Sequence, residues 1–492
     1  MAVRSAYDDS FFKETWLIML GTFLLSIIGG LLGGAAPALV LLWAPLAYHY
    51  LFRAPVHIGA RVLLVLGLFI EPPEMMPGAR YWTSPLDSAN HALYARLKEL
   101  TGIPGLSFPL FLVAIIVLLY RARKQEGPTL RTPSARIARN VLSTVIFAIL
   151  AVEAYGIVRG GRVEPSFNQI LEIFMMPLAG LLFFYALRGK QDLYAIGNII
   201  VSVAIARSLL VAWVYWVVCR PMGIVPEYAT THGDSTTFAA AFLILLANII
   251  EQRNARTLGR FAFASFVLLA AMAMNNRRLV FMAIGAGAVA MYVSLPPSQI
   301  RRRVNKYLWI MGPLLALYLF IGEGSKHPFF SPAKLVWSAL EQKDSSSGSR
   351  VIENTNLIAT YSDSPVLGQG FGFPYKEVVR SVDLTEFMPL YKFIPHNSVL
   401  WLWSAGGIIG FVFLWLGYVG ATFFAARAHR LAEGPIERAG TLAAVGMVAV
   451  CMMTDWGDVG AKSDMKVLVF GVAFGVGARL CAEWENRERG LA

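Results

Sequence analysis

The chain has 492 residues, of which 56% are hydrophobic and only 15% are charged. Soluble domains carry about 25% charged residues, so the composition excludes an ordinary soluble protein and indicates one polytopic membrane domain. The net charge of +12 does not indicate a nucleic acid partner, because the basic residues lie mostly in short loops between apolar runs, where they orient membrane helices.

Apolar runs recur along the whole chain, and a transmembrane helix needs roughly 20 such residues. Candidate spans lie at about 15–33, 35–52, 57–71, 105–120, 139–158, 168–187, 193–219, 235–251, 260–274, 278–295, 306–322, 397–426, 438–456 and 464–482. Several are short, and only a glycine-rich turn separates the first two. The sequence therefore predicts an all-α transmembrane bundle of 12–14 spans.

Lysine and arginine are concentrated in every second loop, for example 121–139, 253–260 and 301–306. The positive-inside rule assigns such loops to the cytoplasm. It predicts an even number of spans, with both termini cytoplasmic. The stretch Met1–Glu14 and the run after it show no cleavable signal.

The polar stretch Glu323–His396 then lies on the outer side of the membrane, which is the periplasmic side if the host is Gram-negative. It divides the chain into a bundle of about eleven spans (1–322), a periplasmic loop (323–396) and the C-terminal spans (397–492). A segment of 74 residues that does not need to span the bilayer indicates chemistry or binding at one face.

The loop sequence predicts two short helices. Pro332 favours a helix start, with the helix ending near Gln342, and Ser349 can cap a second helix over 350–360. The glycines of the segment 368–372 then allow a tight, irregular return.

Three cationic side chains occupy costly positions. Arg277 and Arg278 lie at the outer end of a short hairpin, where the positive-inside rule disfavours cations. They either snorkel to lipid headgroups or bind an anionic ligand. Arg207 lies near the middle of its span, at a cost of about 3 kcal/mol on insertion scales. It either forms a structural ion pair with Glu153 or Glu172, or binds phosphate in a water-filled cavity.

Polar residues also gather at the predicted outer ends of helices. His396 stands between the loop and the next span, and histidine is the side chain most often used as a base, while Asn397 can cap the helix that follows. His232 precedes another span, which Asp234 or Ser235 can cap. Arg350 either starts a loop helix with a functional role or is a solvated side chain.

The remaining polar features and the cysteines do not indicate a functional site. Asp455, Asp458, Lys462 and Asp464 predict a solvated outer hairpin. The three cysteines have no paired spacing, and the chain shows no metal-ligand cluster and no phosphate-binding loop of the Walker type. The sequence therefore predicts no metal site and no cofactor.

Three motifs resemble those of one family. They are Asn275-Asn276-Arg277-Arg278 before an apolar run; Gly348-Ser349-Arg350 followed by Ser364–Gly372; and Pro395-His396-Asn397 followed by Ala405–Phe411. Their order and the long outer loop resemble the O-antigen ligase and O-antigen polymerase superfamily of bacterial membrane glycosyltransferases. The resemblance covers about residues 270–425, and Asn276 stands where the family often has serine.

The resemblance implies a reaction. A glycan on undecaprenyl pyrophosphate would be transferred to an acceptor hydroxyl, with inversion and without a metal, in polysaccharide biosynthesis. His396 would be the general base, and Arg277 and Arg350 would bind the pyrophosphate. Arg207, Arg278, His232 and Asn397 are secondary candidates. Implied partners are the lipid-linked glycan, an acceptor glycan or lipid A–core, the bilayer and a chain-length regulator.

Alternatives remain open at this point. The sequence favours an O-antigen or exopolysaccharide polymerase over an O-antigen ligase. The span count can exceed the twelve that the resemblance implies for ligases, and polymerases often carry long arginine-bearing outer loops. A polysaccharide transporter or flippase would explain the many spans but not the Pro-His-Asn end of the loop. A non-catalytic assembly subunit is a third class.

Overall fold

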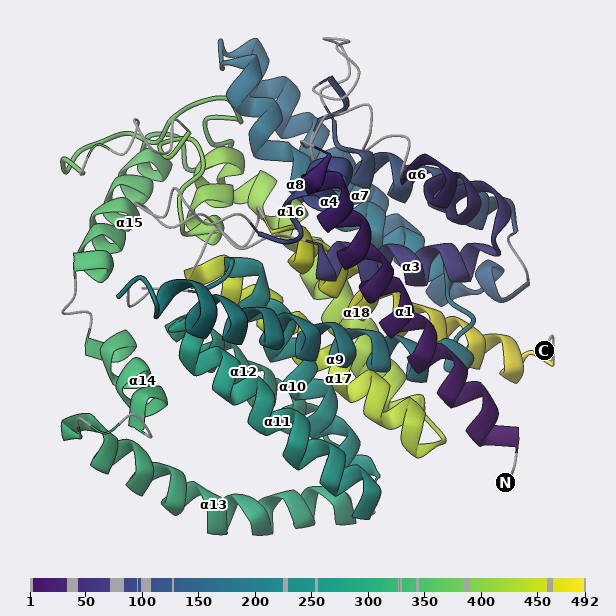
Figure 1. The fold of residues 1–492 in the computed structure, drawn as a ribbon. Coiled ribbons are helices and arrows are strands. Elements are labelled where there is room, and N and C mark those ends of the chain that lie inside the picture. The colour runs from purple at the N-terminus through teal and green to yellow at the C-terminus, as the bar shows by residue number, and fades with distance from the viewer. Residues whose placement is uncertain are drawn as a thin grey trace.

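The computed structural model describes the chain except residues 1–2, 33–42, 71–83, 95, 99–107, 126–127, 224–228, 253–254, 326, 328–329, 342–344, 382, 384–389, 458–462 and 491–492. A few side chains inside helices, that of His232 among them, also lie outside the description. The described residues form helices and no strands (Figure 1).

Ten described helices are long and apolar enough to cross a membrane. The long helices are α1 (Val3–Leu31), α7 (Pro133–Val158), α8 (Val163–Ala186), α9 (Lys190–Trp213, extended by η3, Val214–Cys219), α10 (His232–Glu251), α11 (Ala255–Asn275), α13 (Gln299–Gly324), α16 (Ser398–Leu431), α17 (Pro435–Gly457) and α18 (Asp464–Glu488). Shorter apolar helices are α3 (Val56–Phe69) and α12 (Arg278–Ser294). The all-α, multi-pass prediction is confirmed.

The remaining helices are shorter. They are η1 (His49–Arg53), α4 (Asp87–Tyr94), α6 (Leu110–Lys124), η2 (Pro128–Arg131), α14 (Ser331–Glu341) and α15 (Ser345–Asp363). The expected span 105–120 corresponds to α6, which ends in three basic residues. The expected span 35–52 lies partly outside the described residues.

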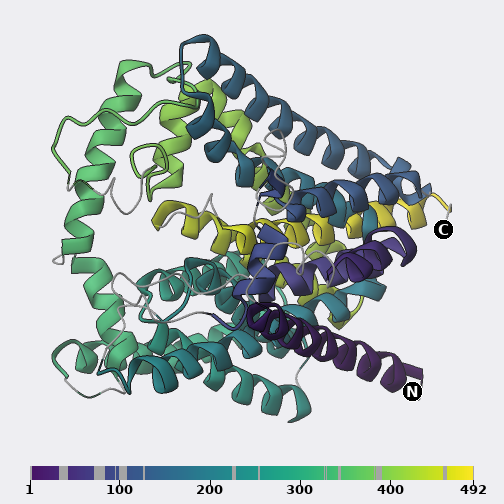
Figure 2. The same ribbon diagram turned by 45° about the horizontal axis from the view of Figure 1, so that its top comes forward.

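The start of α1 and the end of α18 lie on the same side of the bundle in both views (Figures 1 and 2). Below, this side is called the terminal face. Because consecutive long helices alternate in direction, α12 and α16 both start at the opposite face. The connection between α13 and α16, which holds α14 and α15, lies at that face too.

Helix α18 forms the centre of the bundle, with 94% of its apolar window buried. Its glycines allow this burial. A Cβ at Gly471 would lie 2.8 Å from the Ala179 side chain, and one at Gly475 would lie 2.6 Å from Phe183, both on α8. Small residues four apart let two helix backbones approach closely, which is how helices associate in lipid. By contrast, none of the apolar window of α13 is buried, so this helix is at the periphery.

Two loop helices are present, as the sequence predicts, and both views show α14 and α15 along one side of the bundle. Trp337 of α14 donates to the Leu319 carbonyl of α13 at 2.9 Å. Helix α15 begins at Ser345, so the prediction that Ser349 caps it is wrong. Tyr361 of α15 packs on Trp403 of α16, with ring centroids 4.5 Å apart.

The return from α15 is joined to a break in α16. Gly407 has φ 58° and interrupts the helix. Two carbonyls before the break, those of Ser404 and Ala405, accept from the N–H groups of Gln369 and Gly370 at 3.0 and 2.9 Å. After it, Ile408 N–H donates to the Pro365 carbonyl at 2.9 Å. Backbone groups freed by the break are thus satisfied by the loop, as burial requires.

Polar contacts hold the rest of the return. Gln169 of α8 is buried; it accepts from Gly372 N–H and donates to the Phe393 carbonyl, both at 2.6 Å. Outside the spans, Lys392 donates to Glu377 at 2.8 Å, and this hydrogen bond holds the pKa of the Glu377 carboxyl at about 2. The pair is therefore retained at neutral and moderately acidic pH.

Alanine at Gly370 is expected to destabilise this junction. Gly370 has φ 85°, and a Cβ there would lie 2.2 Å from the Cα of Gly156 on α7. Left-handed strain and overpacking together cost about 2–4 kcal/mol. Thermal unfolding in detergent should show a clear loss for Gly370→Ala. Gly312→Ala is the control, because nothing lies within 4 Å of that Cβ; equal unfolding temperatures would contradict the expectation.

Two buried ion pairs correct the sequence interpretation. Arg207 is fully buried, and its partner is Asp234 of α10, with N–O distances of 2.6 and 2.7 Å, rather than Glu153 or Glu172. Asp455 is also buried, and its carboxylate accepts hydrogen bonds from Lys466 and from the Tyr418 hydroxyl. Asp455 is therefore not part of a solvated hairpin, while Asp458 and Lys462 lie outside the described residues.

Candidate active site

His396 is held by Glu353 of α15. One Glu353 oxygen accepts from the His396 backbone N–H at 2.7 Å, and the other lies 3.1 Å from the ring Nδ1. An ionised carboxylate only accepts, so Nδ1 carries the proton and Nε2 keeps its lone pair. Within the described structure Nε2 makes no hydrogen bond. The imidazole is therefore oriented as a general base requires.

The backbone around His396 is fixed from both sides. Asn397 is buried, and its Oδ1 accepts from the Leu400 N–H at 3.0 Å, so the predicted N-cap of α16 is confirmed. Glu353 is 8% exposed and belongs to the α15 segment that packs on α16. The His396 side chain has about a third of its surface exposed. Its position is thus fixed by α15 and α16.

Arg350 precedes Glu353 by one helical turn, and residues three apart on a helix are neighbours. Arg350 is half-buried, and it forms no hydrogen bond or ion pair with the described residues. An unpaired guanidinium beside a histidine–glutamate pair supplies positive charge to an anionic ligand. Because α15 starts at Ser345, Arg350 lies inside the helix and not at its first position.

Arg277 comes from another hairpin at the same face. It is the N-cap residue of α12, and Asn276 before it has φ 52°, a left-handed turn that asparagine tolerates. Asn275 is buried, and its Oδ1 accepts from the N–H groups of Ala229 and Thr230 at 3.0 and 2.8 Å. The hairpin is thereby joined to the segment before α10. Arg277 and Arg278 are both half-buried.

The structure gives Arg207 and His232, two of the secondary candidates, different outcomes. Arg207 serves a buried structural pair and is fully enclosed. His232 begins α10, but its side chain lies outside the description. The structure thus brings His396 and Arg350 to one place and leaves Arg277 on a separate hairpin.

Sequence reasoning did not find Glu353. Its signal is its position three residues after Arg350, within the same helix. Residues three apart share a helix face, so an acid at this position could have been paired with a base elsewhere at the same face. Which base it meets depends on how α15 packs, and the sequence does not show that.

One family model matches the chain. Residues 263–415 match a family described as O-antigen ligase, and this range contains Arg277, Arg350, Glu353 and His396. A search of curated proteins found no match. Such a domain implies a glycosyltransferase-like enzyme of the membrane with lipid-linked glycan substrates. Residues 263–415 of the chain are thus similar to an O-antigen ligase domain, in agreement with the resemblance that the three sequence motifs indicate.

Proposed function

We propose that the protein transfers a glycan from undecaprenyl pyrophosphate to a sugar hydroxyl at the periplasmic face of the bacterial inner membrane. The observation that carries the proposal is the His396–Glu353 pair with unpaired Arg350 one turn away. A base next to a fixed cation suits a reaction in which a hydroxyl loses a proton and a pyrophosphate leaves.

The proposed steps balance as follows. Nε2 of His396 takes the proton of the acceptor hydroxyl as that oxygen forms a bond to the anomeric carbon. The bond from this carbon to the phosphate oxygen breaks on the opposite side, which inverts the configuration. The electron pair leaves with undecaprenyl pyrophosphate, whose charge Arg350 and Arg277 stabilise in place of a divalent metal. Glu353 stabilises the imidazolium.

The preferred acceptor is a second lipid-linked glycan, which makes the protein a polysaccharide polymerase. This preference is supported by the ten long and two shorter apolar helices that the described residues contain besides α6, and by the connection between α13 and α16, which carries Arg350 on α15. The second candidate is transfer to lipid A–core, which the description of the matching family favours.

One experiment tests the function. Purified protein in vesicles is given lipid-linked repeat units, with and without lipid A–core. A ladder of longer lipid-linked glycans supports the polymerase, and a core-linked product supports the ligase. Movement of intact lipid-linked glycan across the bilayer without a new glycosidic bond would identify a flippase and contradict the proposal.

Replacing Glu353 by glutamine is expected to slow transfer about 10- to 100-fold, because a hydrogen bond to a charged group is worth about 1.5–3 kcal/mol. The imidazolium that forms during transfer loses its anionic partner. Initial rates of glycan transfer in vesicles check the effect.

The control is Glu164→Gln, at an exposed carboxylate in the first turn of α8. It should keep the wild-type rate. A Glu353→Gln variant that folds normally and transfers glycan at the wild-type rate would contradict the function of Glu353 beside His396.

A further inference from the structure

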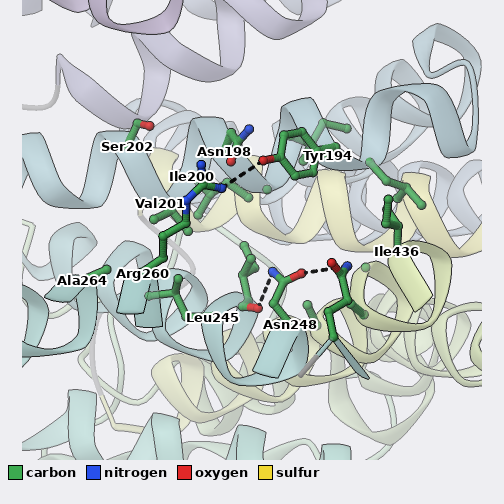
Figure 3. A pocket seen from close by; sticks show the side chains of 18 of the residues that line it. Tyr194, Asn198, Ile200, Val201, Ser202, Leu245, Asn248, Arg260, Ala264 and Ile436 are labelled. Atoms are coloured by element: carbon green, nitrogen blue, oxygen red, sulfur yellow. Dashed lines mark hydrogen bonds between the residues drawn. The ribbon is translucent and has the colours of Figure 1, made fainter. Parts of the chain in front are cut away.

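A cleft of about 620 Å³ lies between α9, α10, α11 and α17 (Figure 3). Most of its lining comes from the start of α9, the end of α10 and the starts of α11 and α17, and Phe12 of α1 and Val472 and Val476 of α18 add to it. By the alternation of the helices, these ends lie at the terminal face, opposite to His396. The cleft is therefore separate from the candidate active site.

The lining changes character with depth. Tyr194, Asn198, Gln252 and Arg260 lie within about two or three turns of helix ends at the terminal face. Further along the helices the wall is mostly apolar and includes Ile205, Leu245 and Met447. A polar end and a long apolar wall match an amphipathic ligand.

Hydrogen-bonding capacity is left over at the polar end. Arg260 donates from Nη1 to the Tyr194 hydroxyl at 3.2 Å, and in the described residues this is its one hydrogen bond. The Asn198 amide makes none there. Figure 3 shows these three side chains close together at one side of the cleft. Arg260 is the one charged side chain among the described lining residues, and no aspartate or glutamate accompanies it there.

We propose that this cleft binds an anionic phospholipid. Arg260, Tyr194 and Asn198 would take the phosphate, to which a guanidinium can donate two parallel hydrogen bonds. An acyl chain would lie along the apolar wall. Phe263 at the cleft is 67% exposed and stands where the membrane supplies lipid. A free phosphate ion would use the polar end but leave the apolar wall empty. The proposal is independent of the glycosyltransferase assignment.

The test uses the full chain in nanodiscs of equal phosphatidylglycerol and phosphatidylethanolamine, followed by release into detergent and a count of retained lipids by native mass spectrometry. One basic residue near a bilayer contributes enough for about a fivefold preference for the anionic lipid. Arg260→Gln should remove this preference. Arg430→Gln, an exposed arginine near the end of α16, should keep it.

A second pair of variants tests the apolar wall. A Cβ at Gly197 lies 3.6 Å from Ile244 Cγ2, an ordinary contact, so Gly197→Ala fits. Gly197→Leu fills the cleft and should lower the number of retained lipids, while Gly197→Ala should not. Unchanged lipid preference in Arg260→Gln would overturn the proposal. Thermal stabilisation by inorganic phosphate equal to that by phosphatidylglycerol would overturn the lipid assignment.

Discussion

His396→Ala is expected to abolish detectable glycan transfer, with a loss in rate of about 10²- to 10⁴-fold. Without the imidazole, no group at this position takes the proton of the acceptor hydroxyl. Glu353 also loses the ring nitrogen with which it pairs. The initial rate in reconstituted vesicles, followed by the appearance of elongated lipid-linked glycan, measures the effect.

The matched control is His91→Ala, because His91 is an exposed histidine of α4. It should retain the wild-type rate. Thermal unfolding of both variants separates loss of chemistry from loss of folding. If His396→Ala folds normally and transfers glycan at the wild-type rate, His396 is not the base.

Removing the guanidinium of Arg350 is expected to lower kcat about 10²- to 10³-fold, the usual effect of deleting one electrostatic donor at a developing charge. Arg350→Gln removes the charge, while Arg350→Lys keeps it but loses bidentate donation, so its defect should be smaller. Arg277→Lys should impair transfer in the same direction. Steady-state kinetics with lipid-linked donor measure kcat and KM separately.

Arg380→Gln is the control for charge in the outer loop, because Arg380 is exposed and makes no hydrogen bond or ion pair with residues that the structure describes. It should leave kcat unchanged. Wild-type values of both kcat and KM in Arg350→Gln and Arg277→Lys would contradict a role of these residues in pyrophosphate binding.

The two experiments also separate binding from chemistry. An Arg350 variant with a raised KM and a normal kcat would place Arg350 in donor binding alone, because uniform binding affects KM without affecting kcat. The same pattern in His396→Ala would contradict its role in proton transfer.

Hydropathy and the distribution of basic residues predict the helices and the alternating order of their ends. These signals are strong because the bilayer imposes length and polarity on each span separately. The connection between α13 and α16 with its two helices was predictable for the same reason, as was the Asn397 cap, which depends on residues three apart in the chain. The family motifs also pointed to His396, Arg350 and Arg277 before any geometry.

Packing decided what the sequence left open. Arg207 meets Asp234, 27 residues away, and His396 meets Glu353, 43 residues away. The glycines of 368–372 turned out to join the loop to the α16 break through backbone hydrogen bonds. Local rules set helices because each span must satisfy its own backbone in lipid, whereas a pair between distant residues depends on how whole helices are placed. The sequence by itself thus determined the membrane bundle and its candidate residues, and only the tertiary structure decided which of them share a site.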